Sequence, residues 1–241
     1  MQARKFGFDK WSYVPFLLAL PVAALVLIVA SSGSSGAESE TVSPADAHAI
    51  RRTEALLSGI PQHGAALGDP TAPVTLQFFG DLQCMDSRRV MLGALPFLIR
   101  HWVRDGKLRI VYRSAETDTH DPPEFREQQI AAMAAGQQGK MWTFVDLFYR
   151  EQQPEFTHYA DDAFLEGIAR QAGVNLSRWS EAREFGGWTR LIESDEVLAI
   201  ARRLGSTPSF LIGPTGGEAR PLRHFSFEES KAFDETIRGL L

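Results

Sequence analysis

The sequence contains a single cysteine, Cys84, among its 241 residues. One cysteine cannot form an intramolecular disulfide, and it cannot supply the thiolates that a cysteine-based zinc cluster requires. The chain also has no excess of basic residues, since it contains 25 Lys and Arg but 30 Asp and Glu. That balance argues against a broad surface that neutralises phosphates, so we expect no nucleic-acid partner.

Metal-ligand spacing is missing as well. The six histidines form no H-x-x-x-H or H-E-x-x-H pattern, so a metal-dependent hydrolase is not indicated. Asp118, His120 and Asp121 are cation-binding residue types, but a polar loop before Pro122 and Pro123 explains them more simply. We expect no metal and no cofactor. The hydrophobic share of 44% and the charged share of 23% indicate a globular chain of one or two domains.

Residues 14–30 form an uncharged apolar run, VPFLLALPVAALVLIVA, preceded by Trp11 and Tyr13, which suit a membrane interface. The flanks differ in charge, with Arg4, Lys5 and Lys10 before the run and Glu38, Glu40 and Asp46 after it. The positive-inside rule therefore predicts a cytoplasmic segment 1–13, a transmembrane anchor at 14–30 and an extracytoplasmic remainder in the cell membrane. A cleaved signal peptide and a secreted protein are the rival reading, with residues 35–37 as a small-residue cleavage site.

Residues 31–58 are predicted to be a linker followed by a short helix. The segment SSGSSGAES at 31–39 has the composition of a flexible tether. Ser43 and Pro44 supply an N-cap and a first-turn proline for a helix that reaches about Leu57.

The remaining sequence indicates an α/β fold. Residues 74–79 and 108–112 are β-rich, and the region between them has helical periodicity from about Asp86 to Gly106, with a kink expected at Pro96. This strand, helix, strand unit predicts a parallel right-handed crossover. Helical periodicity dominates from about 123 to 203, a hairpin is predicted from 209–212 and 221–225, and a last helix from 228 to 241.

Cys84 lies where the first strand gives way to the helix. Backbone N–H groups and the positive end of the helix dipole would face its sulfur there, which favours the thiolate. Arg88 and Arg89 would add positive charge and Asp86 would oppose it. The alternative is that Cys84 is a small buried hydrophobic residue, as free cysteines often are.

Several short segments resemble DsbA-like thioredoxin-fold proteins. The region leading into the active site of that family is similar to GIPQ at 59–62, LGDP at 67–70, APVTL at 72–76 and FGDLQC at 79–84. The start of the family's insert helix is similar to QGKMW at 138–142, and its cis-proline loop to GSTPSF at 205–210. The resemblance covers residues 59–241 and implies a thioredoxin-like domain with a helical insert at about 123–203.

In that family a C-x-x-C pair carries out the redox reaction, and the second cysteine resolves the mixed disulfide formed by the first. This chain reads Cys84, Met85, Asp86 and Ser87, and a serine hydroxyl can hydrogen-bond a thiolate but cannot act as the resolving thiol. Relatives often have a buried Glu six residues before the cysteine, where this chain has Phe78. Phe78→Glu is therefore expected to restore a proton acceptor.

The resemblance makes Cys84 and Ser87 the catalytic candidates. It also implies that Thr207 and Pro208 are joined by a cis peptide bond and that a substrate peptide pairs with this loop, beside Met85 and Asp86.

We expect monothiol thiol–disulfide exchange through Cys84. Its partner would be a cysteine-containing protein or a low-molecular-weight thiol, and a membrane redox partner is a further candidate. The alternative is a non-catalytic peptide-binding or chaperone-like domain. The third hypothesis is a function like that of glutathione transferases, in which the C-x-x-S motif would be used.

Overall fold

The computed structural model describes residues 43–117 and 122–241. The apolar run at 14–30 and the polar residues Asp118, His120 and Asp121 lie outside the described residues. Within the described ranges, none of the helices combines the length and the apolar character that crossing a membrane requires.

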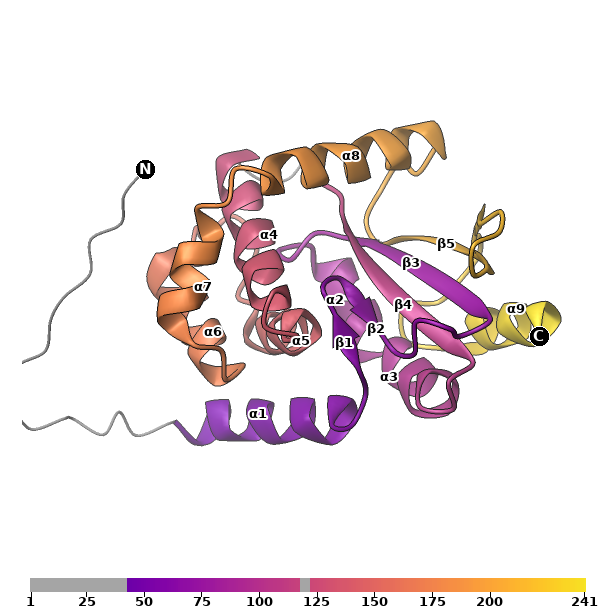
Figure 1. Ribbon diagram of the computed structural model, residues 1–241, viewed down its shortest axis with the longest axis horizontal. Coiled ribbons are helices and arrows are strands. Elements are labelled where there is room, and N and C mark those ends of the chain that lie inside the picture. The colour runs from indigo at the N-terminus through magenta and orange to yellow at the C-terminus, as the bar shows by residue number, and fades with distance from the viewer. Residues whose placement is uncertain (1–42, 118–121) are drawn as a thin grey trace, which may run out of the picture. The chain divides into compact units, whose positions relative to one another are not determined.

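A mixed sheet forms the centre of the fold (Figure 1). Its strands, in spatial order, are β1 (Gln62–His63), β2 (Ala66–Leu67), β4 (Leu108–Ser114), β3 (Val74–Gly80), β5 (Ser209–Pro214) and β6 (Arg220–Pro221). β3 and β4 are parallel, as the sequence predicts, and the other neighbours are antiparallel. β3 is central because its side chains are apolar on both faces, where Leu76, Phe78 and Phe79 are completely buried.

The helical region after Cys84 is broken rather than kinked. It consists of α2 (Met85–Leu92), α3 (Leu95–Leu98) and the π-helical segment η1 (Ile99–Val103). The break falls at Gly93, where an added Cβ would lie 2.7 Å from the carbonyl oxygen of Phe227. That carbonyl accepts the N–H of Ala94 at 3.1 Å, so a distant segment of the chain interrupts the helix.

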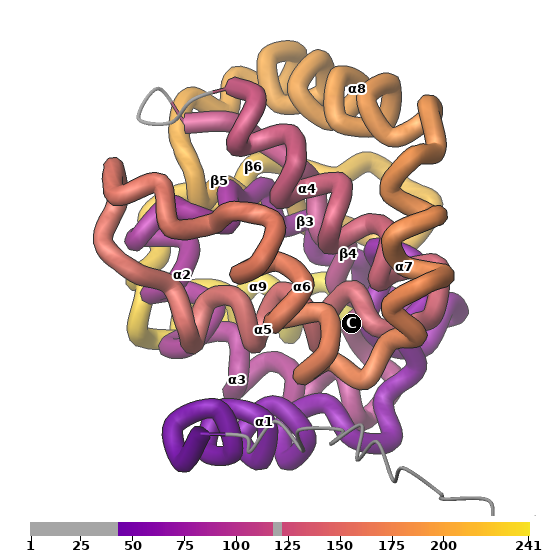
Figure 2. The backbone as a smooth tube through the Cα atoms, turned by 90° about the vertical axis from the view of Figure 1, so that its left-hand side faces the viewer, coloured from indigo at the N-terminus to yellow at the C-terminus, as the bar shows by residue number. Residues whose placement is uncertain are grey.

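Among the described residues, five further helices lie between β4 and β5, where the sequence predicts a helical insert. They are α4 (Pro122–Gly136), α5 (Met141–Glu151), α6 (Asp162–Gln171), α7 (Leu176–Arg183) and α8 (Trp188–Ala201). α5 is surrounded by other helices and contacts α1 (Pro44–Leu57), α2, α4 and α6 (Figure 2). Its predicted core positions Trp142, Phe144, Leu147 and Phe148 are completely buried.

The chain ends in α9 (Lys231–Leu240), three residues later than the predicted start of that helix. The hairpin of β5 and β6 is present, but β6 contains only Arg220 and Pro221. The sequence did not predict β1 and β2, because strands of two residues carry no periodicity.

α1 is held against α5 by a buried polar cluster. Thr53 of α1 donates to the carboxylate of Asp146 at 2.5 Å, and Arg150 donates to the same oxygen at 2.7 Å. The Asp146 side chain is completely buried, whereas 15% of the Arg150 side chain is exposed. Removing this carboxylate would therefore leave a largely buried guanidinium without its charged partner, with only the Thr53 hydroxyl at 3.2 Å as an acceptor.

Asp146→Ala is expected to lower the free energy of unfolding by about 3 kcal/mol, because it leaves one partner of a buried ion pair uncompensated. Denaturant unfolding measures the change. Glu166→Ala is the matched control, since Glu166 and Arg170 form an exposed pair at the same i,i+4 spacing, and we expect a loss of at most about 0.5 kcal/mol. Equal losses in the two variants would contradict this role for Asp146.

Candidate functional site

Cys84 is the N-cap residue of α2 and follows closely after the end of β3. Its Sγ accepts the backbone N–H of Ser87 at 3.4 Å, so the sulfur caps the first turn of the helix. The sequence predicts this position. The residue is 7% exposed, and only a small part of it is open to solvent.

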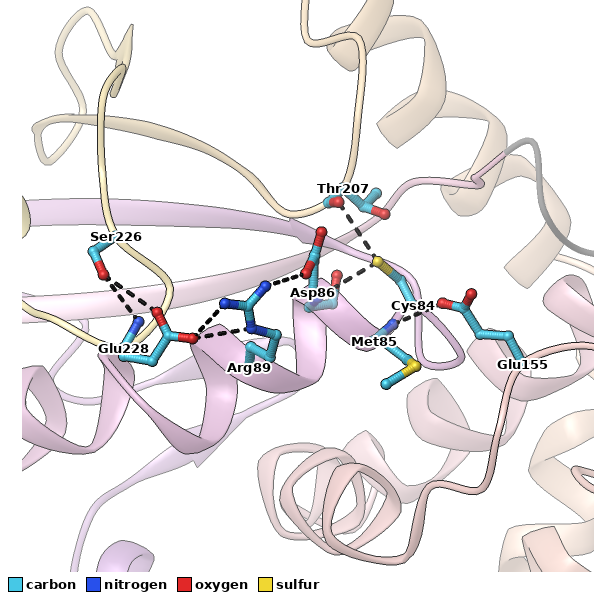
Figure 3. Close-up of polar contacts among 9 residues, drawn as sticks. Cys84, Met85, Asp86, Arg89, Glu155, Thr207, Ser226 and Glu228 are labelled. Atoms are coloured by element: carbon cyan, nitrogen blue, oxygen red, sulfur yellow. Dashed lines mark hydrogen bonds and ion pairs between the residues drawn. The ribbon is translucent and has the colours of Figure 1, made fainter.

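The loop before β5 covers the other side of the sulfur (Figure 3). Thr207 and Pro208 are joined by a cis peptide bond, which confirms the prediction made for this bond. The thiol of Cys84 donates to the carbonyl oxygen of Thr207 at 3.5 Å. The sulfur therefore lies between the α2 N-terminus and the cis-proline loop, two segments 123 residues apart in sequence.

Ser87 interacts with Cys84 differently from the expectation. Its backbone N–H makes the contact with the sulfur, whereas its hydroxyl is buried and has no hydrogen-bond partner in the described part of the chain. The hydroxyl of Thr207 is also buried without a partner there. The two residues that contact the sulfur through backbone groups thus each carry a buried hydroxyl without a partner among the described residues.

Two buried tyrosines fix the turn that leads into Cys84. Tyr112 donates its hydroxyl to the carbonyl oxygen of Gly80 at 3.0 Å, and Tyr149 donates to that of Asp81 at 2.9 Å. Burial raises the pKa of both phenols, so both remain protonated donors at neutral pH. Gln152 completes this support by donating to the carbonyl oxygens of Leu82 at 2.7 Å and Cys84 at 3.3 Å.

Glu155 is a site residue that sequence reasoning missed. Its carboxylate accepts the backbone N–H of Met85 at 2.9 Å, although the two residues are 70 positions apart (Figure 3). It belongs to the loop after α5, and no local pattern indicated that this loop reaches the α2 N-terminus. A negative charge therefore lies at the helix end that the Cys84 sulfur also caps.

Glu155→Gln is expected to speed the alkylation of Cys84 by roughly twofold to fivefold. The substitution removes a negative charge that opposes the thiolate at the same helix N-terminus, where one charge contributes about 0.3–1 kcal/mol. The amide oxygen can still accept the Met85 N–H, so the geometry should persist. Iodoacetamide labelling followed by mass spectrometry gives the rate, with Glu166→Gln as a remote control. An unchanged or slower rate would show that the carboxylate does not oppose thiolate formation.

The charges predicted near Cys84 are largely paired. Arg89 binds Asp86 at 2.9 Å and Glu228 at 2.6 Å, and it lowers the pKa of the Glu228 carboxyl (Figure 3). Arg88 donates through Nε to the carbonyl oxygen of Tyr149 at 2.8 Å. The two arginines therefore anchor α2 to its neighbours as well as adding positive charge.

Phe78 occupies an aromatic cluster rather than a polar position. Its ring stacks on Phe210 with centroids 5.2 Å apart and meets Tyr112 edge-on at 5.4 Å. The residue is completely buried.

Met85 follows Cys84 directly and is 48% exposed, whereas Thr207 is buried. Ser87 and Thr207 contact the sulfur through backbone groups, and Asp86 and Pro208 line one cavity with Thr207, so the structure brings the predicted site residues into one region. Within residues 43–117 and 122–241, no group of His, Cys, Asp and Glu is arranged to hold a metal ion.

Comparisons with known proteins agree with this fold. A family model described as Thioredoxin matches residues 62–221. BdbD from Bacillus subtilis has a TM-score of 0.61 and 17% identity, with 76% of this chain and 97% of that chain covered. For alpha-DsbA1 from Wolbachia pipientis the TM-score is 0.61 and the identity 19%, with 78% and 94% covered.

A thioredoxin-like oxidoreductase from Silicibacter pomeroyi has a TM-score of 0.56 and 26% identity, with 77% of this chain and 96% of that chain covered. No curated protein sequence matches the chain. The fold is DsbA-like, as the sequence predicts.

Proposed function

The chain belongs to the thioredoxin family, and we propose on that premise that it carries out thiol–disulfide exchange with Cys84 as a monothiol. The observation that carries the proposal is the position of the sulfur, which caps α2 and lies 3.5 Å from the carbonyl oxygen of Thr207. A cysteine at a helix N-terminus beside the cis-proline loop suits nucleophilic attack on a disulfide.

The reaction takes two exchange steps. The Cys84 thiolate attacks one sulfur of a substrate disulfide, a new disulfide forms between Cys84 and that sulfur, and the other substrate sulfur leaves as a thiolate. Ser87 cannot break the new bond, so a thiolate from a second molecule must attack it. That attack releases Cys84 as a thiolate and leaves the substrate sulfur bonded to the incoming thiol. The protein therefore undergoes no net oxidation or reduction.

The cis-proline loop would hold the substrate during these steps. A peptide in extended conformation can pair with the backbone at Thr207, and such strand addition is sequence-tolerant because main-chain groups make the bonds. Met85 is exposed next to the sulfur and would contact the substrate side chains. Pro208 and Asp86 would contact the same part of the substrate, because both lie beside Thr207. The partner would be a cysteine-containing protein or a low-molecular-weight thiol.

The test uses a peptide whose cysteine is activated as a pyridyl disulfide. Attack by Cys84 releases one pyridinethione for each mixed disulfide formed, and absorbance measures the release. Wild type is expected to react in a single stoichiometric turnover and to gain the mass of the peptide, whereas Cys84→Ala releases nothing. A folded wild type that never gains this mass would overturn the proposal.

A non-catalytic peptide-binding domain is the second candidate, favoured by the small exposed fraction of Cys84 and by Ser87 at the resolving position. Thiol–disulfide exchange requires the sulfur of Cys84, whereas peptide binding does not. Cys84→Ser should abolish covalent capture under the first and should leave peptide affinity unchanged under the second. Calorimetry with a peptide lacking cysteine measures that affinity.

We also propose that residues 14–30 anchor the chain in the cell membrane with the domain outside the cytoplasm, and that a membrane redox partner meets the domain there. The charge asymmetry around this run supports the orientation. Protease added to intact cells is expected to degrade the domain. Protection of the whole chain would contradict the orientation, and a mature protein that begins near Glu38 would contradict the anchor.

A further inference from the structure

A cavity of about 410 Å³ opens directly beside the proposed exchange site. Thr207 and Pro208 line it on one side, and Asp86, two residues after Cys84, lines it as well. Its remaining apolar lining comes from the end of the chain, mainly Phe210, Leu222, Phe225 and Phe227. Any substrate that pairs with the cis-proline loop would therefore place a neighbouring side chain near this cavity.

The exposed residues of the cavity are mainly basic. Arg203, Arg223 and His224 lie on it, and all three are exposed. Within the two described ranges, the side chains of Arg203 and Arg223 make no hydrogen bond or ion pair, whereas the carboxylate of Asp86 is bound by Arg89. The two guanidinium groups thus keep their donors available, and the one acidic residue of the lining is paired with Arg89, which it shares with Glu228.

The backbone carries Arg203 and His224 in an unusual conformation. Their φ values are 55° and 58°, in the left-handed region that residues with a Cβ seldom adopt. Such conformations persist where the surrounding structure holds them, and they gather at functional sites. At Arg203 this conformation ends α8, where the N–H of Arg203 donates to the carbonyl oxygen of Ile200 and the N–H of Leu204 to that of Ala199, both at 2.9 Å, so the end of the helix fixes the backbone that carries this side chain.

The other side of the same loop has the opposite charge. A second cavity of about 310 Å³ shares Thr207 with the first and is lined by Glu116 and Glu196 together with apolar residues. A peptide that crosses the cis-proline loop would meet guanidinium groups on one side and carboxylates on the other. The two sides of the loop therefore differ in the charge of their lining residues.

We infer that the cavity lined by Arg203 and Arg223 receives a carboxylate next to the substrate cysteine, so that the preferred substrate is a disulfide in an acidic peptide. This inference rests on the proposed exchange function of Cys84 and adds its substrate class. Arginine suits the role because its planar fork binds a carboxylate through two parallel hydrogen bonds. The acidic peptide can come from a protein segment or from a small thiol such as glutathione.

The experiment compares three pentapeptides with a central cysteine activated as a pyridyl disulfide and flanked by Asp, Asn or Lys. The full chain is used, and pyridinethione release is followed at low ionic strength. Wild type is expected to react about tenfold faster with the Asp peptide than with the Asn peptide, and slowest with the Lys peptide. The pyridyl disulfide of glutathione is a further substrate, and its rate relative to the Asp peptide distinguishes a small thiol from a protein segment.

Arg203→Gln combined with Arg223→Gln is expected to remove the preference for Asp. Arg220→Gln is the matched control, because Arg220 is exposed three residues from Arg223, pairs with Glu218 and does not line the cavity. Salt gives a test that needs no variant, since at about 1 M the screening length falls to about 3 Å and the preference of wild type should shrink.

Equal rates for the three peptides at low salt would overturn the inference and leave the exchange function intact. A preference that survives the double substitution would likewise overturn the assignment to Arg203 and Arg223. If wild type releases nothing from any peptide or from a neutral dipyridyl disulfide, the exchange function itself fails. The neutral disulfide therefore distinguishes the failure of the substrate class from the failure of the function.

Discussion

Ser87→Cys is expected to give the protein an internal disulfide with Cys84 and the two-step cycle of a dithiol. Residues 84 and 87 are on the same face of the first turn of α2, where the Ser87 N–H lies 3.4 Å from the sulfur. The substitution breaks no hydrogen bond of the side chain, because the Ser87 hydroxyl has no partner within the described ranges. The new thiol would therefore attack the mixed disulfide on Cys84 from within the molecule.

The expected effect on the mixed disulfide is large. A tethered thiol acts at an effective concentration in the millimolar range, so release should be about a thousandfold faster than with micromolar external thiol. Mass spectrometry after rapid acid quenching follows the adduct, and a loss of two hydrogens marks the internal disulfide. Ser87→Ala is the control and should keep the long-lived adduct of wild type.

Two outcomes would contradict parts of the account. A variant that forms the internal disulfide but exchanges with no substrate would show that the cis-proline loop does not bind peptides. A variant that never forms the disulfide would show that the side chains of residues 84 and 87 are not close together, and would contradict the position of Cys84 at the N-terminus of α2.

Phe78→Glu is expected to destabilise the protein by about 4 kcal/mol, rather than to speed exchange. The resemblance to DsbA-like proteins favours the substitution, because it implies a Glu at this position. The structure argues against it, since Phe78 is completely buried between Phe210 and Tyr112. A carboxyl there loses the ring packing and has no charged partner, and losses of this kind are among the largest for single substitutions.

The loss should also depend on pH. Burial raises the pKa of an introduced carboxyl in the folded state, so the folded protein holds its proton at a pH where the unfolded chain has released it. The destabilisation is therefore smallest below about pH 4 and grows as pH rises. Denaturant unfolding at several pH values measures this, with Phe78→Leu as the control that loses packing without adding charge. A stability of Phe78→Glu equal to that of Phe78→Leu at neutral pH would contradict the expectation.

The sequence was informative where the cause of a structure is local. Ser43 and Pro44 predict the start of α1, and the β-rich run before Gly80 predicts β3. The position of Cys84 as a helix cap follows from the change of periodicity at that point. The resemblance to DsbA-like proteins supplied the cis bond before Pro208, which no local pattern distinguishes from an ordinary trans proline.

Features with distant causes could not be predicted. Gly93 interrupts the helix after Cys84 because the backbone of Phe227 occupies the space beside it. Glu155 reaches the Met85 N–H only because α5 carries the following loop to the start of α2. The basic cavity was missed for the same reason, since Arg203 follows α8 and Arg223 follows β6, and these two loops meet only in the folded chain.

The lifetime of the mixed disulfide on Cys84 tests the central claim most directly. Wild type is loaded with a disulfide peptide, freed of small molecules and followed by intact-mass spectrometry with and without added thiol. Monothiol exchange predicts an adduct that persists without thiol and is released at a rate proportional to the thiol concentration. An adduct that dissociates at one rate at every thiol concentration, or a folded protein that forms none, would contradict it.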